Sequence, residues 1–554
     1  MNYLETLTQQ PLKYSDNEEV VEKNIDDLAI NTPDGPSQDK NFLYFRSGEN
    51  IKIFDRVCDH NGGKLSIKGT TARCPLHGWE LDLKSGLYAN VHCEKKPLLD
   101  INVNKHNSSI ISIIKNSKRL CDDDFDEMKK TEIRFINHAS LLFKLDGISF
   151  ATDPWIFGSA FCNGWWLSKN SPNDAFDELN KCDFIYISHN HPDHLHKDSL
   201  KKIRRDMPIL TANFLSGSTK KLISEYGFSN IIAMDFVTKF TDISNQISFS
   251  VLKSGDFRDD SGLYIQHGRF KCLLTVDSHF LNFGKLPKVD LLASSFAGGS
   301  TGFPICFENY TEEEKTPIIT RNRKAYKVIN STNIRDTQAK YFLPYAGFFM
   351  EKAKRDDYVK QLNKKNSIED FEEACELNNC SLLNLNKHQK FIFNGSELES
   401  KTLDETEKNP SYDVEEYISE SISKYKDNLS DSVLSYFSRC DFKDTLIVDL
   451  IATNDDFSTY CDRFLLDFKT NEYSSISIDY DSTKIENDVL SSNSRYLQIK
   501  VRASELSVVL KEGKPWEDLA IGFQCRIYRQ PNVYNSKFWF YFTNIYIGQA
   551  AATS

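Results

Sequence analysis

The sequence predicts a multidomain protein: a small all-β domain, then a layered α/β domain, then a small mixed α/β domain at the C-terminal end. Short β-type runs, separated by turns rich in Gly and Asn, occupy residues 41–118. Apolar strands alternate with helix-like segments across residues 131–400, a pattern typical of sheets covered on both faces. Residues 413–554 mix both patterns. The polar residues 1–40 are expected to form a mobile or loosely docked leader.

Composition narrows the class of protein. The 68 basic and 79 acidic residues give a formal charge of −11, which argues against a nucleic-acid binder. No segment approaches the roughly 18 consecutive apolar residues that would span a bilayer, and the first residues do not predict a secretion signal. The 13 cysteines follow no regular spacing, so reduced thiols and a cytoplasmic location are expected.

The first β domain carries two short pairs of metal ligands. Cys58 and His60 form one pair, and Cys74 and His77 form the other, with thirteen residues between the pairs. This is the ligand pattern of a Rieske [2Fe–2S] cluster, in which two histidines replace two cysteines on one iron. Structural zinc is the alternative, but a zinc finger would place both cysteines in one pair. Glycines follow both pairs and would let backbone amides approach the sulfurs.

A second group of ligands follows an apolar strand in the layered domain. Three imidazoles and a carboxylate fall within six residues: His189, His191, Asp193 and His194. This spacing is the signature of the metallo-β-lactamase fold, an αβ/βα sandwich. His189 and His191 are expected to bind one metal ion, and Asp193 and His194 a second. Asp277 ends another apolar strand and is expected to bridge them, so the site would hold one or two ions.

Further residues of the layered domain are examined for a place in or near this site. His138 and Asp153 are expected near the floor of the site, and Asp256 is a candidate oxygen ligand. His267 is expected in a surface turn. His279 either points into the site or is a plain loop residue.

Two segments each allow more than one role. The glycine-rich loop Phe296–Pro304 either presents amides to a phosphate or carboxylate, or is a tight turn that needs small residues. In the C-terminal domain, the aromatic run Phe538–Phe542 is expected to form a strand. That domain is expected to close the pocket or to mediate dimers.

Together with other segments, these motifs resemble the CMP-N-acetylneuraminate hydroxylase family across about residues 40–545. The segments that carry the resemblance outside the ligands are Asp153–Trp155, Gly164–Leu167, Ile185–His189, Thr275–Asp277, Phe296–Pro304, Pro344–Phe349, Trp516–Leu519 and Ile521–Gln524. The resemblance implies a monooxygenase that converts CMP-Neu5Ac to CMP-Neu5Gc by hydroxylating the N-acetyl methyl group. It implies that electrons from a reductase arrive through a b-type cytochrome or a ferredoxin. The Rieske cluster would then pass them to non-haem iron, which activates O2.

The sequence departs from the family pattern at two positions where a histidine can stand, and its loop between the two Rieske ligand pairs is short. Asp256-Phe257-Arg258 stands where a histidine is expected, and Lys352-Ala353-Lys354 stands where another can occur. Three alternatives therefore stay open. One is a related hydroxylase acting on another amino sugar. The second is a metallohydrolase whose Rieske cluster senses redox state, and the third is an electron carrier or binding protein with a vestigial second site.

Overall fold

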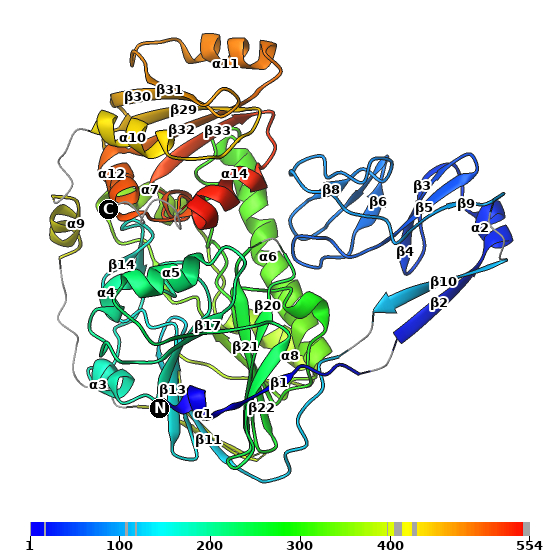
Figure 1. Ribbon diagram of the computed structural model, residues 1–554, viewed down its shortest axis with the longest axis vertical. Helices are drawn as coiled ribbons and strands as arrows, with labels where there is room; N and C mark the ends of the chain where they lie inside the picture. The colour runs from blue at the N-terminus through cyan, green and yellow to red at the C-terminus, as the bar shows by residue number, and fades with distance from the viewer. Residues whose placement is uncertain are drawn as a thin grey trace.

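The computed structural model describes residues 2–15, 18–105, 109–116, 119–256, 258–395, 397–403, 413–423 and 429–546. It confirms the multidomain fold class (Figure 1). A small β domain, blue in Figure 1, projects to one side of a layered α/β domain drawn in cyan and green. A mixed α/β domain, orange to red, caps one end of the layered domain.

The layered domain is built on two eight-stranded sheets. The first sheet has the order β18 (Ile231–Met234), β17 (Ile209–Ala212), β16 (Phe184–Ile187), β13 (Ile148–Thr152), β12 (Ser140–Leu145), β11 (Lys130–Asn137), β27 (Lys390–Asn394) and β28 (Glu397–Lys401). The second has the order β1 (Thr8–Pro11), β19 (Thr238–Asp242), β20 (Ile247–Lys253), β21 (Ser261–His267), β22 (Phe270–Val276), β23 (Leu291–Ser295), β24 (Tyr341–Tyr345) and β26 (Ser381–Leu382). The buried faces of the sheets meet in one core, where Phe150 stacks on Phe184 at 4.8 Å and meets the edge of Phe249 at 5.5 Å.

Helices cover the outer faces of both sheets. On the first sheet, three short helices pack through their apolar residues onto β16 and β17: α3 (Ala175–Asn180), α4 (Lys197–Leu200) and α5 (Ser218–Glu225). On the second sheet lie α6 (Glu312–Thr337) and α8 (Glu372–Leu377), which contact each other. β16 is buried on both faces, as the sequence predicted. It ends where the predicted metal ligands begin.

The β domain consists of two small sheets that share one interior. The four-stranded sheet is β3 (Gly35–Gln38), β4 (Phe42–Ser47), β5 (Asn50–Asp55) and β9 (Leu99–Asn102). The three-stranded sheet is β6 (Ser66–Lys68), β7 (Thr71–Arg73) and β8 (Glu80–Leu81). The loops after β5 and between β7 and β8 carry the two predicted ligand pairs.

The first 40 residues were expected to form a loosely docked leader, but the described residues among them form strands that pair with other parts of the chain. β1 pairs with β19 in the second large sheet, β2 (Glu18–Asn24) pairs with β10 (Ile110–Asn116), and β3 belongs to the β domain. These strands lie at sheet edges. An edge strand is held mainly by backbone hydrogen bonds, so a polar composition does not reveal it.

The C-terminal domain is a five-stranded sheet with helices on its faces. The strand order is β31 (Glu472–Ser475), β30 (Tyr460–Asp467), β29 (Leu446–Thr453), β32 (Arg495–Arg502) and β33 (Cys525–Gln530). Its helices are α10 (Leu429–Ser438), α11 (Ser482–Ser491), α12 (Ala503–Glu512), α13 (Glu517–Ile521) and α14 (Ser536–Phe540), whereas α9 (Val414–Ser423) packs against Trp166 and Ala353 of the layered domain. The strand expected at Phe538–Phe542 is wrong, since α14 and the helical turn after it occupy these residues. Residues 538, 539, 542, 543 and 546 are buried, which is the spacing of a helix face, and Asn544 is buried as well.

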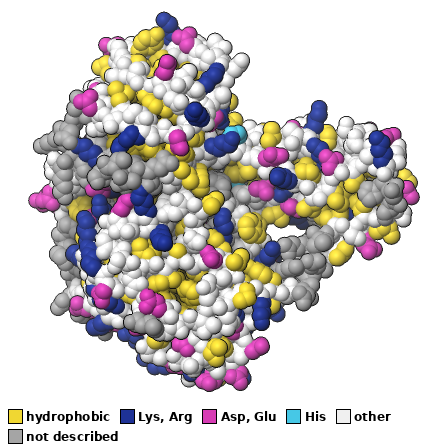
Figure 2. Space-filling view, in the orientation of Figure 1, with side chains coloured by type: hydrophobic (Ala, Val, Ile, Leu, Met, Phe, Trp, Pro, Cys, Tyr) yellow, Lys and Arg dark blue, Asp and Glu magenta, His cyan; other side chains and the backbone are white. Residues whose placement is uncertain are grey.

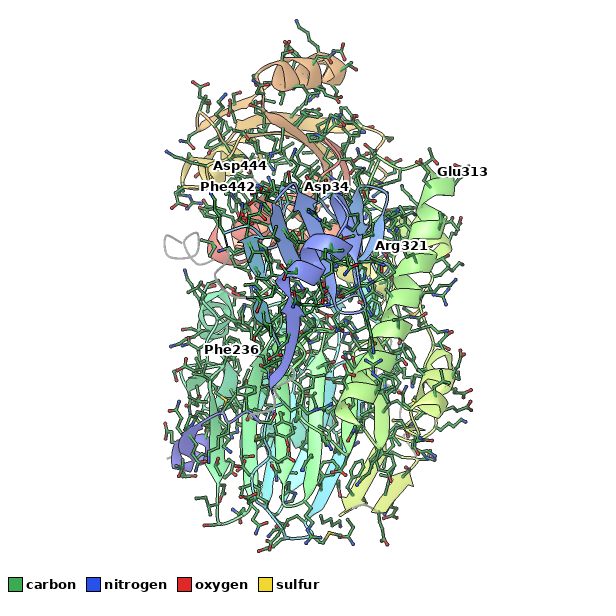
Figure 3. The ribbon with its side chains drawn as sticks, turned by 90° about the vertical axis from the view of Figure 1, so that its right-hand side faces the viewer. Asp34, Phe236, Glu313, Arg321, Phe442 and Asp444 are labelled. Atoms are coloured by element: carbon green, nitrogen blue, oxygen red, sulfur yellow. The ribbon has the colours of Figure 1, made fainter. Side chains whose placement is uncertain are left out.

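The β domain meets the layered domain along α6 and one loop. Ala325 and Ile329 of α6 join the hydrophobic core beneath the ligand loops, and Arg321 of the same helix lies beside the β domain (Figure 3). The space-filling view shows the β domain as an arm joined to the rest at its inner end, with acidic and basic side chains interspersed over this face (Figure 2). Within the described part of the chain, no helix has the length and apolar character needed to traverse a bilayer.

Candidate metal centres and the cavity between them

The two ligand loops of the β domain repeat one hydrogen-bond pattern. The Cys58 amide donates to the carbonyl of Gly63 at 2.8 Å, and the Gly62 amide donates back to the carbonyl of Cys58 at 3.0 Å. In the second loop, the Cys74 amide donates to the Trp79 carbonyl at 2.8 Å, and the Gly78 amide donates to the Cys74 carbonyl at 3.0 Å. The residue four places after each cysteine has positive φ, 69° at Gly62 and 76° at Gly78. Glycine meets this requirement without strain.

The four predicted ligands of the β domain converge. Cys58 and Cys74 are buried and their thiols contact each other. The rings of His60 and His77 lie 4.5 Å apart, and Nδ1 of each ring is buried without a hydrogen-bond partner. Two thiols and two unpartnered imidazole nitrogens at one place fit a [2Fe–2S] cluster with mixed ligands.

The backbone around the cysteines favours thiolates. The pKa of Cys74 is lowered to about 7, first by its contact with Cys58 and then, against burial, by the backbone amides of His77 and Leu76. The contact with Cys74 and burial raise the pKa of Cys58, while the amide of His60 acts in the opposite direction. A Cβ at Gly63 would lie 2.6 Å from the Sγ atom of Cys74, so this position has room only for glycine. Such close amides stabilise thiolate ligands and tune the potential of the cluster.

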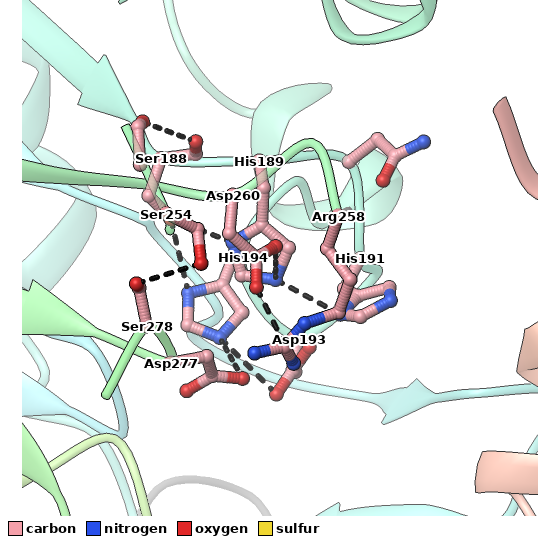
Figure 4. Close-up of polar contacts among 12 residues, drawn as sticks. Ser188, His189, His191, Asp193, His194, Ser254, Arg258, Asp260, Asp277 and Ser278 are labelled. Atoms are coloured by element: carbon pink, nitrogen blue, oxygen red, sulfur yellow. Dashed lines mark hydrogen bonds and ion pairs between the residues drawn. The ribbon is translucent and has the colours of Figure 1, made fainter. Parts of the chain in front are cut away.

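The second site divides the predicted ligands of the layered domain into two groups. His189, His191 and Asp277 offer donor atoms within 4.8 Å of one another. Asp193 and His194 form the other group, which His138 completes within the same distance. The side chains of His189, His191, Asp193, His194 and Asp277 lie around one centre (Figure 4). They come from the loop after β16, the end of β22 and the turn between β11 and β12.

Unpartnered atoms show that the second site fits metal ions. Nδ1 of His138, Oδ1 of Asp193 and Nε2 of His194 are buried and have no hydrogen-bond partner. Nε2 of His194 lies 3.4 Å from Asp193 and 3.5 Å from Asp277. Imidazole and carboxylate groups at these distances suit iron or zinc.

A second layer of polar groups holds the ligand rings. Asp153 accepts hydrogen bonds from the amide and hydroxyl of Ser188 at 2.8 and 2.7 Å and lies 2.9 Å from Nδ1 of His194. The Ser188 hydroxyl also lies 2.9 Å from Nδ1 of His189. These contacts turn Nε2 of both rings toward the site, as partners of metal-binding histidines do. Burial lowers the pKa of His189, whereas Asp193, Asp277 and Asp153 outweigh burial and raise that of His194.

Arg258 lies where the sequence departs from the family pattern. Its guanidinium group bonds Asp256 at 2.8 Å and lies 3.4 Å from Asp260, and Asp256 belongs to neither ligand group. The expectation of Asp256 as a ligand is therefore not supported by its position. Phe257, which stands between Asp256 and Arg258 in the sequence, lies outside the described residues. Burial raises the pKa of Asp260 to about 6.

Two other histidines differ in their positions. His267, expected at the surface, is fully buried, and its Nδ1 lies 2.8 Å from the hydroxyl of Thr131 between β21 and β11. His279 does face the site region. It lies at the cavity described next, with its ring 4.5 Å from Tyr326.

One cavity of about 350 Å³ joins the two centres. Its walls include His60 and His77 from the β domain, and His191 and Asp277 from the layered domain. Phe280 lies at this junction, because a Cβ at Gly62 would be 2.6 Å from its ring and one at Gly255 would be 2.5 Å away. Both sets of ligands thus open onto the same space within a single chain.

The C-terminal domain forms another wall of the cavity. The spacing of the ligand motifs in the sequence did not indicate which of its residues would do so. Glu517 of α13 lies 3.7 Å from Nε2 of His191. Burial lowers the pKa of His191, but Glu517 and Asp260 raise it to about 9. Arg529, Tyr534 and Trp539 of the same domain also reach the cavity. These residues follow the metal motifs by more than 300 positions, so only the fold brings them together.

Comparisons with known proteins agree with the folds of the β domain and the layered domain. A model of the Rieske [2Fe-2S] domain matches residues 20–107, and a model of the Beta-lactamase superfamily domain matches residues 132–258. The chain is similar to the cytidine monophosphate-N-acetylneuraminic acid hydroxylase of Xenopus laevis, with 29% identity over 91% of this chain and 88% of the relative.

Relatives of the same name from two mammals match as well. The protein of Mus musculus is 28% identical over 91% of each chain, and that of Macaca mulatta is 28% identical over 93% of this chain and 90% of the relative. The resemblance predicted from the sequence is thereby confirmed. It extends well beyond the ligand motifs.

Proposed function

We propose that this protein is a monooxygenase that hydroxylates the N-acetyl methyl group of a CMP-activated sialic acid, converting CMP-Neu5Ac to CMP-Neu5Gc. The observation that carries the proposal is the shared cavity, which both candidate metal centres line. The names of the similar proteins support the substrate.

The proposed reaction replaces one methyl C–H bond by C–OH. One atom of O2 enters the product, and the other leaves as water after taking up two electrons and two protons. Bound iron would supply the activation of O2 for an unactivated C–H bond, and a bound Rieske cluster would supply electrons one at a time. We propose Cys58, His60, Cys74 and His77 as cluster ligands, and His189, His191, Asp193, His194 and Asp277, joined by His138, as ligands of one or two iron ions.

The chain itself would orient the substrate and exclude water. Part of the cavity wall is apolar and is formed by Phe161, Trp165, Ile305 and Phe307. An apolar lining excludes water and so limits side reactions. Glu517 reaches the same cavity and accepts a hydrogen bond from the hydroxyl of Tyr534 at 3.3 Å. Its carboxylate is partly exposed, so it can deliver protons from solvent to the cavity.

The three segments would divide the work. Residues 41–118 would receive electrons, residues 131–400 would hold the reacting groups, and residues 413–554 would close the cavity. A b-type cytochrome or a ferredoxin, with its reductase, would supply electrons to the outer face of the β domain. A cytoplasmic location is part of the proposal, supported by 13 cysteines of which none is joined in a disulfide.

The test is anaerobic purification with iron counted per chain, followed by CMP-Neu5Ac, reductant and labelled O2. The expected product is heavier by one labelled oxygen atom. An unchanged substrate with full iron would reject the substrate and favour another amino sugar. Turnover without O2 or reductant would favour a metallohydrolase, and an absence of iron beyond the two atoms of the cluster would favour a vestigial second site.

A further inference from the structure

Among the residues that the structure describes, the buried arginines are paired with carboxylates, with one exception. Arg463 bonds Asp449 at 2.6 Å, and Arg502 bonds Asp356 at 2.7 Å. Arg529 of β33 is only 8% exposed, yet it forms no ion pair with any carboxylate that the structure describes. A buried charge without a counter-charge is costly, so such groups are normally paired.

The neutral groups around Arg529 hold it in place. Its Nε–H donates to Oδ1 of Asn532 at 2.9 Å, and its guanidinium carbon lies 4.8 Å from the centre of the Phe307 ring. Asn309 fixes the backbone of Arg529 on both sides, accepting from its amide at 3.1 Å and donating to its carbonyl at 2.9 Å. Tyr310, the other neighbour, accepts a hydrogen bond from Asn532 at 3.0 Å. The side chain is therefore already in position before any ligand arrives.

Arg529 lines the cavity that joins the two metal centres. On the same cavity, Asp277 and Glu517 mark the side of the second centre. Ser300 and Thr301 of the glycine-rich loop also face the cavity and offer hydroxyl groups. Arg258 lines the cavity as well, but it is paired with Asp256 and Asp260, so Arg529 supplies a positive charge that no described carboxylate offsets. A positive charge on one wall would orient a substrate that carries an anion at one end and a neutral group at the other.

We propose that Arg529 is the anion-binding subsite of this cavity and receives an oxyanion of the substrate, which leaves a neutral group to face the second metal centre. This inference rests on the proposed function. In a CMP-activated sialic acid, the phosphodiester and the carboxylate are attached to one carbon atom, and either can supply the oxyanion. A guanidinium group bonds both with two parallel N–H donors.

The test measures equilibrium binding to the full-length protein as purified, without turnover. The probes are CMP, which carries the phosphate, free N-acetylneuraminic acid, which carries the carboxylate, and cytidine, which carries neither. Arg529→Gln is expected to weaken binding of CMP or of N-acetylneuraminic acid by about 10- to 100-fold, as for a lost charge-assisted contact, and to leave cytidine unchanged. Whichever probe is weakened identifies the source of the oxyanion.

Arg526→Gln is the matched control. It removes the same charge from the same strand, but Arg526 stacks on Tyr358 and Phe457 outside the cavity. Its binding of both anionic probes is expected to equal that of the wild type. Equal weakening in both variants, or unchanged binding of both anions in Arg529→Gln, overturns the subsite. So does a wild type that binds neither anion.

The visible absorption of the cluster and the unfolding midpoint report whether each variant folds. If Arg529→Gln does not fold, Arg529→Lys decides, because lysine keeps the charge and loses the paired donors. Weaker binding of the same anion supports the subsite, and unchanged binding overturns it. The function is judged separately: a wild type that hydroxylates nothing, but whose binding of CMP depends on Arg529, rejects the function and keeps the subsite.

Discussion

A carboxylate oxygen of Asp153 lies 2.9 Å from Nδ1 of His194, and both side chains are buried. This contact holds the ring so that Nε2 points toward Asp193 and Asp277. Asp153 comes 41 residues earlier in the chain and contributes no donor to either ligand group. We therefore propose that Asp153 positions the candidate ligand His194.

Asp153→Asn is expected to weaken metal binding at the second centre by roughly 10- to 100-fold, since partners of ligand histidines have effects of that size. Metal titration followed by analysis of bound iron measures it. Asp146→Asn is the matched control. Both aspartates have positive φ, 37° and 40°, which asparagine tolerates, and Asp146 bonds Lys129 away from the site. Equal metal affinity in Asp153→Asn and wild type would contradict the role of Asp153.

The two ligand groups predict two separable metal ions. His138→Ala should remove the ion of one group, and His189→Ala the ion of the other, so each variant should lose one metal equivalent per chain. Both should keep the absorption of the cluster in the β domain, because neither residue belongs to it. His388→Ala, outside both groups, is the control. Complete loss of second-site metal in each single variant would instead indicate one shared ion.

Gly62 lies in the first cluster loop against Phe280 and has a φ of 69°. Gly62→Ala adds a methyl group 2.6 Å from that ring as well as backbone strain. Gly69 has a similar φ of 65° with open space around it, so Gly69→Ala should show the strain alone, about 1 kcal/mol. Thermal unfolding and cluster absorption should therefore be affected more by Gly62→Ala. Equal losses in the two variants would show that the contact with Phe280 is unimportant.

Asp39 ties the β domain together and predicts a dependence of stability on pH. Burial alone would raise the pKa of Asp39, but Lys23, Tyr44 and the amides of Phe42 and Asn41 lower it to about 2. A lowered pKa stabilises the fold above about pH 4, and this stabilisation is lost as the pH falls toward 2. Asp39→Asn should therefore lower the midpoint of urea unfolding at pH 6.

The difference between Asp39→Asn and wild type should narrow at pH 3. Asp100→Asn, on an exposed position of β9 in the same sheet, is the control and should match the wild type at both pH values. A difference that stays constant from pH 6 to pH 3 would show that the carboxylate of Asp39 does not stabilise the fold by its charge.

Short spacing explains what the sequence could predict. His189 to His194 and the two cysteine–histidine pairs lie within a few residues, so their joint role is visible without the fold. His138 and Asp153 were expected near the floor of the site, but their contacts with Asp193 and His194 depend on how β11, β13 and β16 pair. Arg529 and Glu517 could not be assigned, because no local pattern says which wall a distant strand or helix will form.

The wrong predictions have physical reasons too. The aromatic run at 538–542 suits a strand by propensity, yet the surrounding core buries one helical face of it, and packing outweighs propensity. His267 looks like a turn residue beside Gly268, but the end of β21 lies under β11 and is covered.

The candidate cluster site of the β domain is buried in apolar surroundings on its cysteine side and borders the cavity on its histidine side. Cys58 and Cys74 belong to a hydrophobic core, whereas His60 and His77 border the cavity. A negatively charged ligand entering that space would therefore approach the imidazole side and make the addition of an electron less favourable, by simple Coulomb repulsion. Binding of an anionic ligand in the cavity would then lower the redox potential of the cluster. The potential of the cluster would therefore depend on whether the cavity is occupied.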